Sequence, residues 1–212
     1  MMIHTFPSGP LLTNAYVIEC ENTKQCAIID PGIESFDSIT TLVKDRDLKV
    51  QCIILTHSHW DHTSGVAKLK NYFKTPLWAH PDDKENVEHP GSDGLPMLYA
   101  IEATNVDKEL FDNEIFSIGS IHWKVIHTPG HSPGGICLYS SEDKVLISGD
   151  TLFKGSIGNL SFSTAEPEKM WHSLDKLKVL PPETRVYPGH GETTTIKQED
   201  WLPNARALFG YA

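Results

Sequence analysis

The chain has 212 residues, a formal net charge of -10 and 39% hydrophobic residues. This length and composition are typical of a globular protein with one large domain, and we expect a single domain over residues 1–212. The acidic balance, without a run of Lys and Arg, argues against a nucleic-acid partner. No apolar stretch reaches the roughly 20 residues that cross a bilayer, so we expect no membrane partner.

The cysteines and the N-terminal segment indicate in which cellular compartment we expect the protein. The segment 1–7 has neither the basic nor the apolar part of a secretory leader. Cys20, Cys26, Cys52 and Cys137 form no C-x-x-C motif, and three of them lie in apolar runs where a free thiol packs as a small hydrophobe. We therefore expect a reducing, cytoplasmic location, while a Cys20–Cys26 disulfide stays open.

Short apolar runs alternate with helical patterns along the chain. Strands are predicted at 12–20, 26–29, 50–55, 121–127, 136–139, 144–147 and 185–187. Helices are predicted where apolar residues share one face, around 36–43, 66–73 and 170–177. The segment 81–112, which is rich in Pro, Gly, Asp, Glu and Asn, is predicted to be a long loop or lid. The mixture indicates a layered α/β or α+β fold.

The strongest local motif follows the apolar run 52–55. It contains His57, His59, Asp61 and His62 within six residues. A neutral imidazole offers a nitrogen lone pair near pH 7, which makes His the commonest metal ligand. His57 and His59 would point to the same side of an extended strand end, and the following turn would aim Asp61 and His62 at a second position nearby. A chance cluster of surface residues is a much poorer explanation than a metal site.

Three further polar residues have the same context, just beyond an apolar run. They are His131, Asp150 and His190, and a glycine directly precedes each. Such a glycine lets the backbone turn tightly and approach a ligand. Seven His and Asp side chains without a Cys are too many for one ion, so we expect two divalent ions that share a carboxylate and a water. We expect zinc, with iron or manganese as alternatives, because His and Asp sites accept all three.

The pattern H-x-H-x-D-H with a later His, Asp and His resembles the metallo-β-lactamase superfamily. Flanking matches such as 13–16, 30–32, 128–134 and 189–191 extend the resemblance over nearly the whole chain. Within the superfamily the chain is most similar to the short hydroxyacylglutathione hydrolase (glyoxalase II) group. The resemblance implies an α+β fold, the four-layer αββα sandwich. It also implies that the first metal takes His57, His59 and His131, and that the second takes Asp61, His62 and His190, with Asp150 bridging.

The resemblance favours a metal-dependent hydrolase of small acyl thioesters, with a glutathione thioester as a possible substrate. A water between two metal ions loses its proton near neutral pH, and the hydroxide would attack the carbonyl while Asp61 and Asp150 orient it. Alternatives that stay open are a persulfide dioxygenase with one iron and a hydrolase of lactones or phosphodiesters. A non-catalytic metal-binding domain is disfavoured by the complete ligand set. The sequence does not indicate an oligomeric state.

Two departures from the glyoxalase II pattern concern the substrate. The match does not extend to the helical C-terminal domain of those enzymes, because the chain ends at Ala212. Asn159 stands near the position where the group typically has a basic residue. We therefore expect the metal chemistry to be preserved and the recognition of glutathione to be altered.

Overall fold

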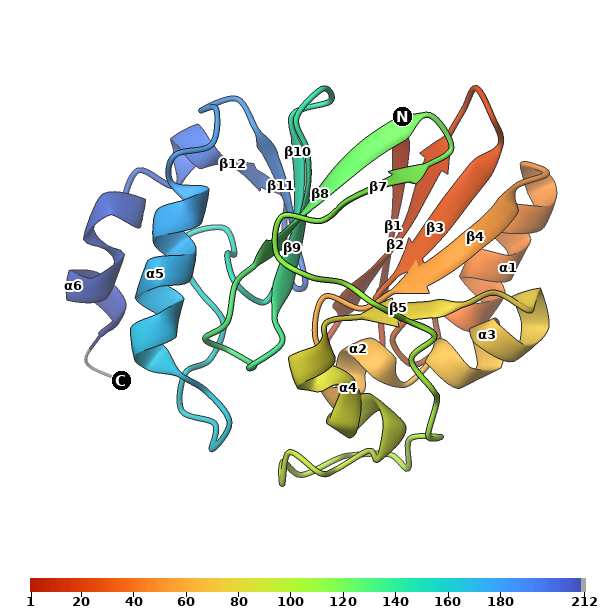
Figure 1. Ribbon diagram of the computed structural model, residues 1–212, viewed down its shortest axis with the longest axis horizontal. Coiled ribbons are helices and arrows are strands. Elements are labelled where there is room, and N and C mark those ends of the chain that lie inside the picture. The colour runs from red at the N-terminus through yellow and green to blue at the C-terminus, as the bar shows by residue number, and fades with distance from the viewer. Residues whose placement is uncertain (211–212) are drawn as a thin grey trace.

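Two six-stranded sheets face each other in the computed structural model, which describes residues 1–210 (Figure 1). The first sheet contains, in spatial order, β1 (Met2–Ser8), β2 (Thr13–Cys20), β3 (Gln25–Ile29), β4 (Lys49–Ile54), β5 (Leu77–Ala79) and β6 (Lys108–Glu109). The second contains β12 (Thr194–Thr195), β11 (Arg185–Pro188), β10 (Val145–Gly149), β9 (Ile136–Ser140), β8 (Ile121–His127) and β7 (Ile115–Ile118). Both sheets are mixed, with parallel pairs such as β3–β4 and β10–β11.

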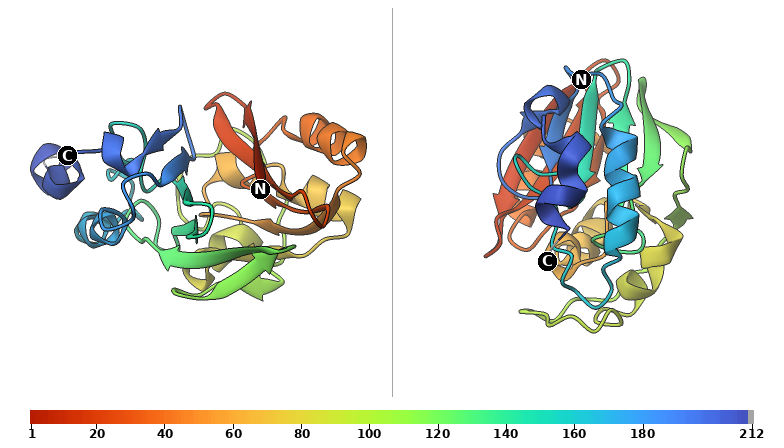
Figure 2. Two further views of the ribbon diagram at one scale, coloured as in Figure 1. Left: turned by 90° about the horizontal axis from the view of Figure 1, so that it is seen from above. Right: turned by 90° about the vertical axis from the view of Figure 1, so that its left-hand side faces the viewer.

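Helices cover the outer face of each sheet (Figures 1 and 2). The helices are α1 (Phe36–Asp45), α2 (Trp60–Thr63), α3 (Val66–Phe73), α4 (Pro81–Glu88), α5 (Pro167–Leu177) and α6 (Ala205–Phe209), with short 3-10 turns η1 (Ile196–Gln198) and η2 (Leu202–Asn204). Buried residues of α1 and α3 pack on the first sheet, and those of α5 and α6 pack on the second. The predicted α+β, four-layer αββα sandwich is therefore confirmed.

The central core lies between the two sheets. Alternate residues of β2 point to opposite faces, so Tyr16 and Ile18 enter this core while Ala15 and Val17 face the helices. Trp123 of β8 is completely buried between the sheets. Because both faces of each sheet are covered, the central strands are apolar on both sides, which explains their continuous apolar runs.

The predicted strands and helices are all present, with bounds within two residues of those expected, except that α5 begins three residues earlier, at Pro167. The structure adds β1, β5, β6, β7 and β12, for which no strand was predicted. β1 is an edge strand that is only partly buried, and β5, β6 and β12 have three residues or fewer. Such segments carry little hydrophobic periodicity, so the pattern could not reveal them.

The segment 81–112 differs from the continuous loop or lid that was predicted. It begins with α4, continues without regular structure over 89–107, and includes β6. The helix starts because Pro81 occupies its first turn and the ring of His80 accepts a hydrogen bond from the backbone N–H of Asp82. Its weak apolar periodicity explains why composition alone suggested a loop.

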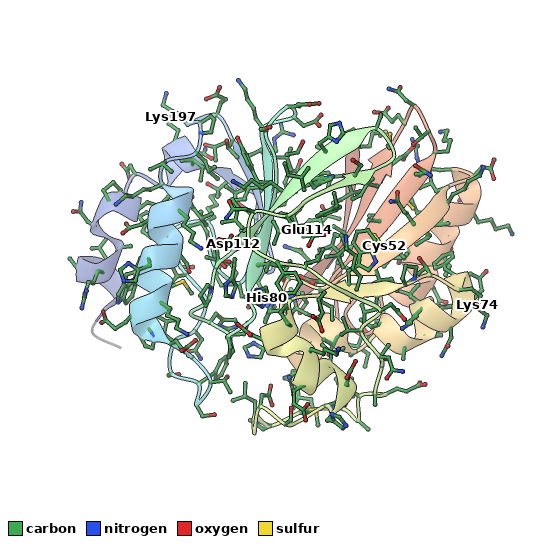
Figure 3. The ribbon with its side chains drawn as sticks, in the orientation of Figure 1. Cys52, Lys74, His80, Asp112, Glu114 and Lys197 are labelled. Carbon is green, nitrogen blue, oxygen red and sulfur yellow. The ribbon has the colours of Figure 1, made fainter. Side chains whose placement is uncertain are left out.

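The lysine side chains labelled in Figure 3 lie on the outside, whereas the cysteine thiols are buried. Figure 3 shows Lys74 and Lys197 at opposite outer edges of the molecule, and both are exposed. All four cysteines are free and buried, including Cys52 on β4, so Cys20 and Cys26 form no disulfide. Within residues 1–210, no helix has both the length and the apolar character that crossing a membrane requires.

Candidate metal centre

The seven residues singled out in the sequence meet at one edge of the sandwich. They come from the segments that follow four strands: β4, β8, β10 and β11. His57 and His59 lie in the loop after β4, and Asp61 and His62 lie on the short helix α2 that continues it. The later residues His131, Asp150 and His190 follow β8, β10 and β11 respectively.

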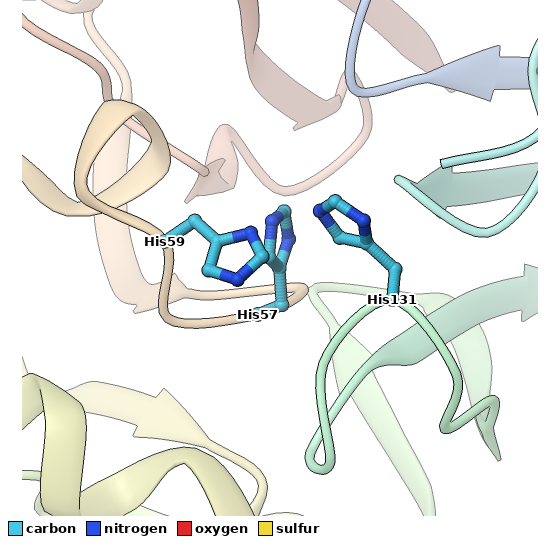
Figure 4. A group of neighbouring side chains, drawn as sticks. All are labelled: His57, His59 and His131. Carbon is cyan, nitrogen blue, oxygen red and sulfur yellow. The ribbon is translucent and has the colours of Figure 1, made fainter. Parts of the chain in front are cut away.

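The first cluster consists of His57, His59 and His131. One ring nitrogen from each lies within 4.8 Å of the others, and all three side chains are buried. Figure 4 shows the three rings turned toward a common point, with His131 approaching from a different loop. Three neutral imidazoles in this arrangement could hold one metal ion and leave a position open.

The second cluster consists of Asp61, His62 and His190, whose ligand atoms also lie within 4.8 Å of one another. Asp150 lies between the clusters. Its Oδ1 is 3.4 Å from Nε2 of His62, and its Oδ2 is 3.3 Å from Nε2 of His131. The two oxygens of one carboxylate thus face both clusters, as a bridging ligand would.

Hydrogen bonds on the far side of the rings orient them. Nδ1 of His131 donates to the carbonyl of Asn159 at 2.8 Å, and Nδ1 of His190 donates to the carbonyl of Leu11 at 3.1 Å. Nδ1 of His62 donates to Oδ2 of Asp30 at 3.1 Å. When Nδ1 carries the proton, Nε2 keeps its lone pair and points into the centre.

The ligand atoms that point into the centre show whether these residues could hold a metal ion. Nε2 of His57, His59 and His131, together with Oδ1 of Asp150, are buried polar atoms without a hydrogen-bond partner. Buried polar atoms are normally paired, since leaving one unpaired costs about 1 to 3 kcal/mol. The three Nε2 atoms belong to the first cluster and Oδ1 of Asp150 faces His62 of the second, so each cluster has an unpaired donor atom that a metal ion would satisfy.

Asp30 is a residue of the centre that the sequence analysis did not select. It is buried, and its carboxylate accepts hydrogen bonds from the backbone N–H and the hydroxyl of Thr56 at 2.7 and 2.6 Å, besides that from His62. The Thr56 oxygen is then free to accept from Nδ1 of His57, 3.1 Å away. One carboxylate therefore orients a ring of each cluster. Asp30 directly follows the apolar run of β3, the same signal that marked the other sites.

Burial and charge set the protonation of the rings. Burial lowers the pKa of His59 to about 3 and places the pKa of His57 well below its usual range, so both rings are neutral at pH 7. Burial also disfavours charge on His62, but the carboxylates of Asp61 and Asp150 outweigh it and raise the pKa of His62 to about 9. His57 and His59 can therefore bind a metal without first losing a proton, whereas His62 must release one before it binds a metal.

Gly149 and Gly189 allow the loops that carry the proposed ligands to pack closely against one another. A Cβ at Gly189 would clash with Oδ1 of Asp150 and lie 2.9 Å from Cε1 of His62. Gly149 has a φ of +48°, and a Cβ there would lie 2.5 Å from the hydroxyl oxygen of Thr56. The expectation that glycines let the backbone come close to the site is confirmed at both positions.

A cavity of about 360 Å³ opens beside the clusters. Part of its lining comes from His59, Asp61, His131, Asp150 and His190, so a molecule in it would touch the centre. The remainder is mostly apolar, with Leu11, Trp60, Leu95, Pro96, Phe153 and Phe162. Trp60, which lies between site residues in the sequence, therefore does line the pocket.

A further group, His80, Asp82 and His127, also brings potential ligand atoms within 4.8 Å. The rings of His80 and His127 stack with centroids 3.9 Å apart and planes 14° from parallel. The lone pairs of an imidazole lie in the ring plane, so two stacked rings do not direct them to a common point. This geometry argues against a metal site at His80 and His127.

Comparison with known proteins agrees with this geometry. The sequence profile of the Metallo-beta-lactamase superfamily matches residues 8–190. The hydroxyacylglutathione hydrolase GloC of Haemophilus influenzae is 34% identical over 205 residues, covering 94% of this chain and 95% of that protein. The chain belongs to the metallo-β-lactamase superfamily, and among its relatives are metal-dependent hydrolases.

Two solved structures extend the likeness to three dimensions. The BLEG-1 B3 metallo-beta-lactamase superposes with a TM-score of 0.86 at 34% identity, covering 99% of this chain and all of that one. The TTHA1623 protein in a di-iron-bound form superposes with a TM-score of 0.79 at 36% identity, covering 92% and 96%. The fold and the metallo-hydrolase class follow from these likenesses.

Proposed function

We propose that the chain hydrolyses small acyl thioesters at a centre of two divalent metal ions. The first ion would be held by His57, His59 and His131, the second by Asp61, His62 and His190, and Asp150 would bridge them. The observation that carries this proposal is the set of unpaired buried atoms, which are Nε2 of the three histidines of the first cluster and Oδ1 of Asp150, which faces His62 of the second. The similarity to the hydroxyacylglutathione hydrolase GloC supports the thioester as the bond that is cleaved.

When bound, the two ions supply a water of lowered pKa as nucleophile and positive charge beside the substrate carbonyl. The protein's own residues then have defined tasks. Asp61 and Asp150 accept hydrogen bonds from the attacking water and so fix its direction. Asp61 is itself held by the hydroxyl of Thr13, which donates to Oδ2 at 2.6 Å. The leaving thiolate, with a pKa of about 8.5, departs without a strong proton donor.

The test is hydrolysis of an acyl thioester panel by protein loaded separately with zinc, iron or manganese. We expect turnover that a chelator abolishes and that the Asp150→Asn variant reduces by at least about 100-fold, because this variant loses a bridging charge. The matched control is His172→Ala, which changes an exposed histidine of α5. An intact panel with all three metals would rule out thioester hydrolysis.

A second candidate is β-lactam hydrolysis, which the likeness to the BLEG-1 B3 metallo-beta-lactamase favours. The same centre would polarise a lactam carbonyl, but the leaving group would be an amine that needs a proton. The two activities are separated by comparing kcat/KM for a thioester and for a β-lactam on one preparation. We expect the thioester to be the better substrate, because a thiolate leaves more easily than an amine.

A further inference from the structure

Apart from the proposed ligands and Asn159, the walls of the cavity beside the metal centre are apolar. Six of the twelve lining residues carry apolar side chains. In the described part of the chain, no Lys or Arg lines this cavity. An anionic group placed against the apolar walls, away from the metal centre, would lose hydration without gaining an ion pair, which is costly.

Two phenylalanines lie directly against the centre, one at each cluster. The ring of Phe162 packs edge-on to His59, with centroids 5.3 Å apart, and lies 5.5 Å from the ring of His131. The ring of Phe153 packs edge-on to His190 at 5.9 Å. A substrate group next to the reacting carbonyl would therefore contact a phenyl ring.

The opposite wall comes from the irregular segment 89–107, which contributes Leu95 and Pro96. This wall is tied to the ligand loop. The side-chain nitrogen of Asn86 donates to the carbonyl of Ser58, next to His59, and to Oδ2 of Asp93, both at about 3 Å. Oδ1 of Asp93 in turn accepts from the backbone N–H of Leu95 at 3.0 Å. The apolar wall is thus held in place before any substrate binds.

Asn159 at the edge of the cavity gives no positive charge. Its side-chain oxygen already accepts from the backbone N–H and the hydroxyl of Ser161, at 2.9 and 2.7 Å. Its backbone carbonyl is occupied by Nδ1 of His131. Asn159 therefore helps to build the centre, and its neutral side-chain amide offers a carboxylate a hydrogen-bond donor but no ion pair.

We propose that the cavity selects substrates whose acyl group is apolar and uncharged, and that Phe162, Leu95 and Pro96 make this selection. The proposal rests on the proposed thioester hydrolysis and goes beyond it by naming the chemical class of the acyl group. It predicts that thioesters with a carboxylate in the acyl part are poor substrates. One methylene in an apolar pocket changes kcat/KM by about 10-fold or more, so the discrimination is measurable.

The experiment compares two thioesters of one thiol, N-acetylcysteamine, on the metal-loaded protein. One carries a pentanoyl group, and the other carries a succinyl group of similar length that ends in a carboxylate. We expect kcat/KM for the pentanoyl thioester to be at least about tenfold higher. Equal values, or a preference for the succinyl thioester, would overturn the proposal.

Two variants test whether the named residues make the selection. Phe162→Ala removes the ring beside His59 and should reduce the pentanoyl preference by about tenfold. Asn159→Lys keeps the backbone carbonyl, adds a cation at the edge, and should raise kcat/KM for the succinyl thioester. The matched control is Phe111→Ala, since Phe111 is 53% exposed and does not line the cavity. An unchanged preference in Phe162→Ala would contradict the assignment of this residue.

A binding measurement separates this proposal from the proposed function. In ketone analogues of both compounds, a methylene replaces the sulfur and no hydrolysis is possible. If neither thioester is cleaved, thioester hydrolysis fails, and the dissociation constants of the ketones still decide the present proposal. Tighter binding of the pentanoyl ketone, weakened in Phe162→Ala, supports it, whereas equal or tighter binding of the succinyl ketone refutes it.

Discussion

At the scale of single residues, the centre depends on side chains behind the proposed ligands. The carboxylate of Asp30 accepts from the ring of His62 and from the hydroxyl of Thr56, and Thr56 in turn accepts from the ring of His57. Asp30 lies beyond the two clusters and would not touch the substrate. Its role is positioning, because it fixes which nitrogen of each ring carries the proton.

The variant Asp30→Ala tests this role. Removing the carboxylate frees the ring of His62 to rotate and leaves the hydroxyl of Thr56 without its acceptor. We expect metal affinity to fall by about 10-fold to 100-fold, measured by titration against a competing chelator. Circular dichroism checks that the fold is kept. Unchanged affinity in a folded variant would show that Asp30 does not orient the ring.

The close packing of Asp150 and His62 against Gly189 leads to a second prediction. The added methyl group of Gly189→Ala would meet Oδ1 of Asp150 and Cε1 of His62 and lie 3.2 Å from the backbone carbonyl carbon of Gly149, so it would displace proposed ligands. We expect the variant to fold but to bind fewer than two metal ions per chain, measured by elemental analysis. Gly94→Ala is the control, because a Cβ there meets nothing within 4 Å, so the strain from its φ of +73° is the only change, and a loss of metal specific to Gly189→Ala comes from the contact with the ligands. Full metal content in both variants would contradict the prediction.

The sequence indicated the proposed metal ligands more clearly than the residues that orient them or line the cavity. The histidines of the H-x-H-x-D-H motif stand close together, and each later residue follows an apolar run and a glycine. Asp30 also follows an apolar run but is a single carboxylate without a neighbouring histidine. Thr13, Thr56 and Phe162 carry no local signal at all, since their roles arise only when distant segments meet.

At the scale of elements, a buried glutamate joins the edge of the first sheet to α1. The side chain of Glu19 on β2 has no exposed surface, and its carboxylate contacts His4 of β1 at 3.0 Å and Nε of Arg46, just after α1, at 2.6 Å. The hydrogen bond from Arg46 is the main cause that holds the pKa of Glu19 down, at about 2. A group with a lowered pKa stabilises the folded state above its unfolded pKa of about 4.5.

This link predicts a pH-dependent stability. We expect Glu19→Gln to lower the free energy of unfolding at pH 7 by about 1 to 2 kcal/mol, a modest value because Arg46 is one-third exposed. The difference between wild type and variant should shrink as the pH falls from about 4.5 to about 2, where Glu19 takes up a proton in the folded state. Urea unfolding of metal-free protein measures it, with the exposed Glu142→Gln as control. A difference that does not change with pH would contradict the ionic origin.

Elements were predictable where the chain is buried on both sides. β2 and β9 are buried along their whole length and β4 over residues 52–54, which gives clear apolar runs in the sequence. The edge strand β1 mixes partly buried and exposed positions, and α4 has charged residues on most of its surface. For these two elements the structure depends on tertiary pairing and on a helix cap, and neither leaves a periodic pattern.

At the scale of the whole molecule, the sandwich brings together segments that lie far apart in the chain. The loop after β4 comes from the first sheet, and the segments after β8, β10 and β11 come from the second. The backbone of Asn14 on β2 donates to the carbonyl of Gly189 at 2.7 Å, so the two sheets are joined directly beside the centre. The position of the centre was therefore foreseeable from strand ends, whereas the apolar cavity was not, because its walls come from irregular segments.

The measurement that tests the metal centre most directly is anomalous X-ray diffraction from crystals of metal-loaded protein, recorded on both sides of the metal absorption edge. We predict two peaks, one among His57, His59 and His131 and the other among Asp61, His62 and His190, with Asp150 contacting both. A peak at His80, Asp82 and His127 instead, or no peak among the seven residues, would contradict the two-metal centre.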